Sequence, residues 1–269
     1  MVSRALVALA LAAVLGGCSH TFFQFHINTV ERNEILTARN ALVVAAQGDV
    51  NTLAAVVDLN GRRAVETLIA GMTVEQTAAE PQYERLTRAL YLGVMGDAED
   101  PLSALDSDMT MIAGRVAQRV ATHSLDQMGL GGIAAMVGMV GDDGGQRLRE
   151  MQGSLVRAQI GTCTELHPVI SYDAGILGHI RSQLAESDPV YLDWRGRVRA
   201  IHLVRFACPR GHVLAVFTKN AGESGVRAIG WHTVSAQQWV SLEPRLRQAL
   251  DLPDRLALRP GTAVVSCTP

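Results

Sequence analysis

The sequence has no large excess of charge and no apolar run long enough to cross a membrane. Its 24 basic and 26 acidic residues give a net charge of −2, which excludes the basic surface typical of nucleic-acid-binding proteins. The run of Ala, Leu and Val from Ala5 to Leu15 would span about 16 Å as a helix, against roughly 30 Å of bilayer hydrocarbon. Because hydrophobic residues make up 48% of the chain, we expect a folded protein with a sizeable core.

Motifs of the common enzyme and cofactor classes are also missing. The sequence contains no GxSxG, HExxH, P-loop or GxGxxG motif, and GESG at 222–225 has the wrong spacing for a nucleophile elbow. The acidic residues between positions 97 and 108 do not follow the order of an EF-hand loop. His202, in an apolar stretch, is expected to be a hydrogen-bonded core residue and not a catalytic base. We therefore expect no catalytic residues and no cofactor.

The N-terminal residues have the layout of an export signal. Arg4 is followed by the apolar run and then by Leu15, Gly16, Gly17 and Cys18. These four residues resemble the lipobox of bacterial lipoproteins, which implies a signal peptide over 1–17, diacylglycerol on the Cys18 thiol and a lipidated tether over 18–27. Ser19 in place of Asp implies the outer membrane, facing the periplasm, more than the inner membrane. The alternative is an ordinary signal peptide with a chance cysteine.

Three cysteines remain beyond the lipobox. An oxidising cell envelope predicts one disulfide and one leftover thiol among Cys163, Cys208 and Cys267. The spacing allows all three pairings. Tethering of the C-terminal tail slightly favours a pair that contains Cys267.

Residues 28–160 are predicted to be mainly helical. Asn28 and Glu31 are placed as a capping box for a helix over 29–47 that stops at Gly48. A short helix capped by Asp49 should end at a turn at Asn60-Gly61, and another should run from Pro81 to about Met95. This section has 11 basic and 17 acidic residues, a net charge of −6, whereas residues 161–269 have 12 and 9, a net charge of +3. The two sections are therefore expected to face each other.

Two amphipathic stretches, one from Met109 and one through Leu148 and Leu155, predict a helical hairpin. Its tip, residues 128–141, carries only a glycine- and methionine-rich apolar sequence without charge. Such a surface adapts to a partner or to lipid, while burial in the core is the alternative. The candidate partner contacts in the tip are Met128, Ile133, Met136, Val137 and Met139.

Residues 161–269 are predicted to form an α+β section. A helix over 173–186 precedes alternating stretches over 197–206, 212–219 and 226–232, which indicate an antiparallel meander. A helix near 243–250 and a strand over 262–265 should complete it. The stretches LVVAAQGD and AIGWH resemble NTF2-like or cystatin-like modules, which implies a curved sheet wrapped around a helix, with a helical insertion in this chain. The predicted class is α+β, a helical section followed by a small antiparallel sheet with flanking helices.

Arginines near the first predicted strand form the most specific charge pattern. If the strand begins near Arg195, alternation places Arg195, Arg197, Arg199 and Arg205 on one face. Guanidinium groups suit carboxylate or phosphate, so this face is a candidate site for an anionic ligand. The alternatives are a solvated sheet face or pairing with the acidic helical section.

Two segments repeat the same spacing between a cysteine and a histidine. CTELH contains Cys163 and His167, and CPRGH contains Cys208 and His212. Two thiolates and two imidazoles suit tetrahedral zinc. The competing prediction is a disulfide, which would leave no thiolate for a metal, and we favour it.

Taken together, these patterns predict a membrane-anchored envelope lipoprotein that is not an enzyme. Its expected role is binding another envelope protein, as an immunity, inhibitor or assembly factor, through the apolar tip or the neighbourhood of Trp194, Trp231 and Trp239. The first alternative is a module for a small anionic ligand that uses the arginine face. The second alternative is a periplasmic hydrolase.

Overall fold

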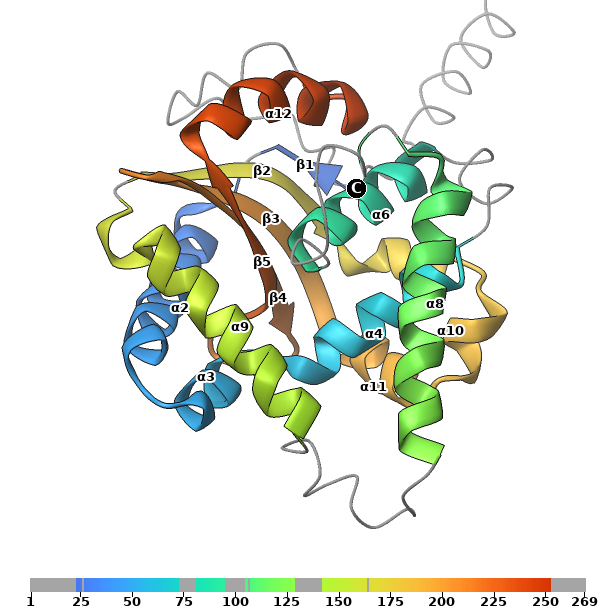
Figure 1. Ribbon diagram of the computed structural model, residues 1–269. Coiled ribbons are helices and arrows are strands. Elements are labelled where there is room, and N and C mark those ends of the chain that lie inside the picture. The colour runs from blue at the N-terminus through green and yellow to red at the C-terminus, as the bar shows by residue number, and fades with distance from the viewer. Residues whose placement is uncertain are drawn as a thin grey trace, which may run out of the picture.

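The computed structural model describes residues 23–25, 27–72, 81–94, 105, 107–128, 142–163 and 165–252. It is an α+β protein in which helices precede and flank an antiparallel sheet (Figure 1). The helices between the short first strand and the four long strands are α2 (Thr29–Gln47), α3 (Val50–Val56), α4 (Leu59–Ala70), α6 (Pro81–Val94), α8 (Met109–Met128) and α9 (Asp142–Ala158). The helices among and after the strands are η2 (Ile160–Thr162), η3 (Ala174–Gly178), α10 (Gln183–Ser187), α11 (Pro189–Arg197) and α12 (Ala236–Ala249). The predicted fold class is confirmed.

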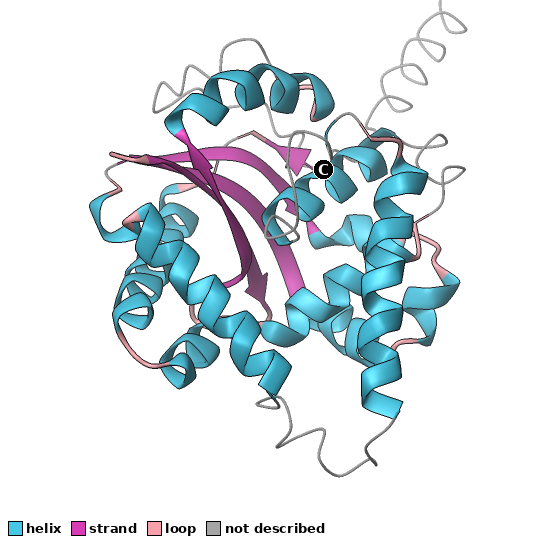
Figure 2. Cartoon of the chain, viewed as in Figure 1, coloured by secondary structure: helices cyan, strands magenta, loops and turns pink. Residues whose placement is uncertain are grey.

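The sheet contains four long strands and one short edge strand, in the order β1-β2-β3-β4-β5. All neighbours are antiparallel, and the sheet is curved (Figure 2). Tyr172 is paired with Ile201 on one side and with Phe23 on the other. The strands are β1 (Phe23–Gln24), β2 (Glu165–Asp173), β3 (Val198–Cys208), β4 (Gly211–Asn220) and β5 (Val226–Ser235).

Both faces of the sheet are buried against helices. On one face, sheet residues such as Ile201, Leu214 and Ile229 form a core with residues of α4, α6, α8 and α12. On the other face, residues such as Val204 and Phe217 form a second core with residues of α2, α3 and α9. Helices from the N-terminal part of the chain therefore cover both sides of a sheet made from the C-terminal part.

Local capping signals predicted several helix ends correctly. The side chain of Asn28 accepts a hydrogen bond from the backbone N–H of Glu31, whose carboxylate accepts one from the backbone N–H of Asn28. Helix α2 ends at Gly48, and Asp49 caps α3, as expected. Helix α6 begins at Pro81 and ends at Val94. The predictions for α2 and α3 are confirmed because each depends on hydrogen bonds within a few residues, and α6 starts where its proline predicts because the fixed φ of proline suits the first helical position.

Two local predictions are wrong. Asn60-Gly61 is not a turn, because Asp58 caps α4 by accepting a hydrogen bond from the Gly61 N–H at 2.8 Å. The region predicted as a helix over 173–186 instead contains the end of β2, the short η3 and the start of α10. Strand β2 was missed because it is buried on both faces, so its apolar residues do not alternate with polar ones.

Helices α8 and α9 do not form the expected hairpin. Met109, Ile112 and Val116 of α8 belong to the core on one face of the sheet. Leu148 and Leu155 of α9 belong to the core on the other face. The amphipathic pattern correctly predicts two helices but says nothing about which surface each one covers. The strand expected over 262–265 lies outside the described residues, and no described helix has the length and apolarity needed to span a membrane.

Candidate functional site

The four arginines predicted to share one strand face do not lie together on a strand. Arg195 and Arg197 lie in the last turn of α11, where Arg197 Nη2 is 2.7 Å from Asp193 Oδ2. Arg199 is exposed at an irregularity between Val198 and Ala200, and Arg205 is half-buried further along β3. The prediction is wrong because the helix continues to Arg197 and the register shift interrupts the alternation.

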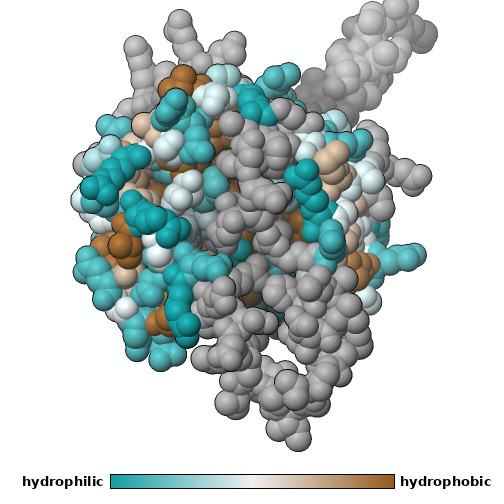
Figure 3. Space-filling model, viewed as in Figure 1, coloured by the Kyte–Doolittle hydropathy of each residue, from teal (hydrophilic) through white to brown (hydrophobic). Residues whose placement is uncertain are grey.

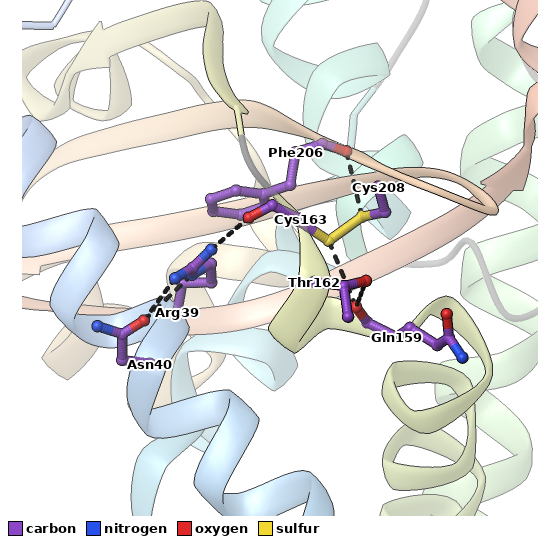
Figure 4. The surroundings of a disulfide bond; sticks show 7 residues. All are labelled: Arg39, Asn40, Gln159, Thr162, Cys163, Phe206 and Cys208. Atoms are coloured by element: carbon purple, nitrogen blue, oxygen red, sulfur yellow. Dashed lines mark hydrogen bonds between the residues drawn. A yellow bond between two sulfur atoms is a disulfide. The ribbon is translucent and has the colours of Figure 1, made fainter.

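The predicted zinc ligands contain a disulfide. Cys163 and Cys208 are bonded to each other and join the segment after η2 to the end of β3 (Figure 4). Neither sulfur is then a thiolate, so a site that combines them with His167 and His212 is excluded. In the part of the chain that the structure describes, no group of three or more His, Cys, Asp or Glu residues could hold a metal ion. The slight preference for a disulfide that contains Cys267 was therefore wrong, because Cys163 is bonded to Cys208. Cys267 itself lies outside the described residues.

The tryptophans proposed as partner contacts are not available on the surface. Trp194 is 0% exposed and Trp231 is 1% exposed. The indole N–H of Trp231 donates a 2.8 Å hydrogen bond to Ser154 Oγ, so this ring holds α9 on the sheet. Tip residues Ile133, Met136, Val137 and Met139 lie outside the described residues, as does the side chain of Met128 at the end of α8.

Arg205 and His212, predicted for two different sites, meet beneath α12. The Arg205 guanidinium lies 4.8 Å from the centre of the Trp239 ring, and the His212 ring centre lies 4.6 Å from it. Trp239 donates a 3.0 Å hydrogen bond from its indole N–H to Glu243 Oε2. We call Arg205, His212, Trp239 and Glu243 the sheet-end cluster. His167 is opposite Arg205 in the β2–β3 register and therefore lies next to this cluster.

Burial and neighbouring charges together set the pKa values of the titratable residues in the sheet-end cluster. Burial, followed by the charge of Arg205, lowers the pKa of His212, so this imidazole is neutral at pH 7. Burial also lowers the pKa of Arg205, while the nearby Glu243 opposes that effect. Burial tends to raise the pKa of Glu243, but hydrogen bonding from Arg247 holds it below its usual value. The cluster therefore fixes α12 to the sheet by a cation–π contact and a compensated charge pair.

A serine–histidine pair is closed off in the core beneath α2. Ser171 Oγ is 2.9 Å from His202 Nδ1, and the two residues are 2% and 1% exposed. This confirms the prediction that His202 is a hydrogen-bonded core residue. A substrate cannot reach these atoms while the helices cover this face of the sheet, so the pair does not form an accessible hydrolytic site.

An apolar groove of about 240 Å³ lies between α2, the end of α9 and η2. Val43 and Ala46 of α2 line one side, and Leu155 and Val156 of α9 line the other. Val156, on this second side, is 54% exposed. Figure 3 shows apolar surface among hydrophilic surface at the left of the view, where α2 and α9 lie. We call this feature the α2–α9 groove.

A run of apolar residues in α2 indicates this groove, although the helical pattern described above did not single it out. Residues 42–46 of α2 are Leu, Val, Val, Ala and Ala. Five consecutive apolar residues cover more than a full helical turn, so they cannot all face one core. Leu42 and Ala45 are buried, whereas Val44 is 65% exposed and Val43 lines the groove.

Comparisons of the chain with protein-family models, curated proteins and solved structures found no match.

Proposed function

We propose that this protein is a lipid-anchored protein of the bacterial cell envelope that acts by binding another envelope protein. The lipobox-like residues Leu15 to Cys18 support the anchor. The Cys163–Cys208 disulfide supports an oxidising compartment, because structural disulfides are rare in reducing cytosol. The outer membrane, facing the periplasm, is the proposed location.

The position of β1 supports a short distance between the lipid anchor at Cys18 and the folded part of the protein. Phe23 and Gln24 pair with Tyr172 and Ser171 at the edge of the sheet. From Cys18 to Phe23 there are five residue steps of about 3.5 Å each, so the tether reaches at most about 18 Å. A lipid on Cys18 would therefore keep the β1 edge within about 2 nm of the bilayer.

The α2–α9 groove supports the binding role, and the exposure of Val156 on its wall is the observation that carries it. An apolar groove of this kind fits a short apolar segment of a partner, either a helix face or an extended strand. Gln47 and Gln159 also line the groove and offer amide donors and acceptors to the partner's polar groups. The closed Ser171–His202 pair makes binding a better account of the described residues than hydrolysis.

The anchor is tested by changing Cys18 to Ser and fractionating cells that produce the full chain. The wild-type protein should sediment with outer membranes and carry fatty acid on its N-terminal cysteine, whereas C18S should lose both properties. Wild-type protein without fatty acid would contradict the proposed anchor.

The groove is tested by placing a photo-crosslinking amino acid at position 156 or, as a control, at position 240. Val240 lies on α12, away from the groove; it is the same residue type as Val156 and is the more exposed of the two, at 75% against 54%. In intact cells, position 156 should give a discrete crosslinked envelope protein, and the added change Val43→Glu should abolish it. Equal crosslinking from both positions, or none from 156, would contradict a binding role for the groove.

A further inference from the structure

The exposed side of α2 carries a stripe of residues without charge. These residues, all exposed, are Val30, Asn33, Thr37, Asn40 and Val44. Their spacing of three and four residues places them along one side of the helix, opposite the side that is buried in the core. Val30 is 67% exposed and Val44 is 65% exposed, so each end of the stripe presents an aliphatic side chain to solvent. We call these five residues the α2 stripe.

The charged residues of α2 lie outside the stripe and have partners within the protein. They are Glu31, Arg32, Glu34 and Arg39. Arg32 and Arg39 donate hydrogen bonds to backbone carbonyl oxygens, at 3.3 and 2.7 Å. Glu34 forms an ion pair with Lys219, and Glu31 closes the N-terminal capping box. A surface helix usually turns its charged residues to solvent, whereas the outermost positions of α2 are uncharged, as is typical of the core of a protein–protein interface.

The α2 stripe has nearly the same order of residue types in both directions from Thr37. Val30 and Val44 each lie seven residues from Thr37, which is about 10.5 Å along the helix axis. Asn33 precedes Thr37 by four residues and Asn40 follows it by three, which is about 6 and 4.5 Å. A second α2 that runs antiparallel, with Thr37 opposite Thr37, therefore places valine against valine and asparagine against asparagine.

The side chains suit the contacts that this pairing makes. Valine against valine buries aliphatic surface that a single chain exposes to water. An amide is both a donor and an acceptor, so two asparagines can hydrogen bond to each other. Asn40 Oδ1 already accepts from Arg39 Nε and Nη2, at 3.2 and 2.7 Å, and no hydrogen bond between described residues uses the Asn40 NH₂ group. This group can donate to Asn33 of the second copy. Such self-complementarity is what a twofold contact between identical chains requires.

The position and length of α2 determine how strong this contact can be. Figure 1 shows α2 at the left edge of the molecule. The stripe from Val30 to Val44 covers about 21 Å of helix. One helix pair of that length buries less than the roughly 1,200–2,000 Å² of a stable interface, so we expect a weak dimer in solution. The proposed lipid anchor would strengthen it by raising the effective concentration of the chains in one membrane.

We propose that two copies of this protein associate through the α2 stripe, as an antiparallel pair of α2 helices whose twofold axis passes Thr37. The α9 wall of the α2–α9 groove, with Val156 and Gln159, lies outside this helix pair. Self-association through α2 goes beyond the proposed binding of another envelope protein, and it requires neither the lipid anchor nor the groove.

Cysteine crosslinking of the purified full-length protein tests the contact, because a disulfide traps a weak dimer. The changes Cys18→Ser and Cys267→Ser first remove the thiols outside the Cys163–Cys208 disulfide. In this background, Thr37→Cys should form a disulfide-linked dimer under mild oxidation, because the two thiols meet at the twofold axis. Val240→Cys is the control for random collision, since Val240 is 75% exposed on α12 and should give little dimer.

Val44 tests whether the stripe itself holds the dimer together. Adding Val44→Glu to the Thr37→Cys variant should slow dimer formation by about tenfold or more, because it places a carboxylate in an aliphatic contact. The folded monomer should be unaffected, since Val44 is 65% exposed. Circular dichroism checks that the fold is retained.

Val30 and Val44 together test the orientation of the pair. In the antiparallel arrangement, Val30 of one copy lies opposite Val44 of the other and about 21 Å from the second Val30. A disulfide needs Cβ atoms within about 4.5 Å. Val30→Cys or Val44→Cys alone should therefore give little dimer, whereas a mixture of the two variants should give a mixed dimer.

The outcomes separate self-association from the proposed binding function. Faster crosslinking of Thr37→Cys than of Val240→Cys, its loss with Val44→Glu and the mixed dimer support the proposal. Equal crosslinking of Thr37→Cys and Val240→Cys, or no effect of Val44→Glu, overturns association through the stripe. Ready dimer formation by Val30→Cys alone overturns the antiparallel pairing. Because the purified protein is not lipidated and its groove is unchanged at position 156, these outcomes do not depend on the anchor or on another envelope protein.

Discussion

Ser171 and His202 are directly opposite each other in the β2–β3 register, with Ser171 Oγ 2.9 Å from His202 Nδ1. Burial lowers the pKa of His202, and the negative charges of Glu31 and Glu34 oppose the effect without cancelling it. The imidazole is therefore neutral in the folded protein at pH 7. The pair links two central strands in a place where a charged ring would be costly.

We predict that this histidine makes the protein less stable in mild acid. Below its unfolded pKa of 6.5, the unfolded chain takes up a proton that the folded protein resists until the lower folded pKa is reached. The free energy of unfolding should therefore be highest above pH 6.5 and fall as the pH decreases below it. Urea unfolding between pH 8 and pH 5 should show a smaller decrease for His202→Gln than for wild type. Equal decreases would show that His202 is not responsible.

Loss of the disulfide should strongly destabilise the fold. Cys163 and Cys208 are 45 residues apart, and closing a loop of that length in the unfolded chain corresponds to about 4 kcal/mol. We expect the double variant Cys163→Ser, Cys208→Ser to lose about 2–4 kcal/mol in urea unfolding. Cys267→Ser serves as the control and should leave the unfolding midpoint unchanged. A large loss in the control would show that the pairing differs.

The buried ion pair of α4 should respond differently from an exposed pair of the same spacing. Arg62 Nε is 3.3 Å from Glu66 Oε1, and the side chains are 3% and 7% exposed. Glu66→Gln should cost about 3 kcal/mol, because it removes a carboxylate beside a buried guanidinium. Asp193→Asn, in the exposed pair with Arg197, should cost less than about 1 kcal/mol. Similar losses in the two variants, measured by chemical denaturation, would contradict this account.

Gly93 of α6 should not tolerate a side chain, although alanine is the better helix former. A Cβ atom there would lie 2.1 Å from Val216 Cγ2, so helix and sheet would have to separate. We expect Gly93→Ala to lower the melting temperature and to cost about 1–3 kcal/mol. Gly114 of α8 has nothing within 4 Å of such an atom, so Gly114→Ala should instead stabilise by about 0.5–1 kcal/mol. The change in the free energy of unfolding should therefore have opposite signs for the two substitutions. The same sign for both would contradict the close packing of α6 on β4.

Much of the secondary structure could be read from short-range patterns. Asn28 with Glu31, and Asp49, predicted where α2 and α3 begin, because a cap is a hydrogen bond between near neighbours. Alternation and the turn before Gly211 predicted β3 and β4. The sheet-end cluster was harder to predict from the sequence. Arg205 and His212 were singled out for separate reasons, and their meeting at Trp239 depends on α12 folding back over the sheet.

The sequence by itself determined the α+β class, most of the long helices and the antiparallel meander, because these follow from periodicity and capping within about twenty residues. Only the tertiary structure decided that α8 and α9 cover opposite faces, that Cys163 pairs with Cys208, and that Trp194 and Trp231 are buried. It also decided that Val156 borders an open groove. An apolar side chain has the same hydrophobicity in a core and on a surface, so its role depends on which distant segment of the chain lies against it.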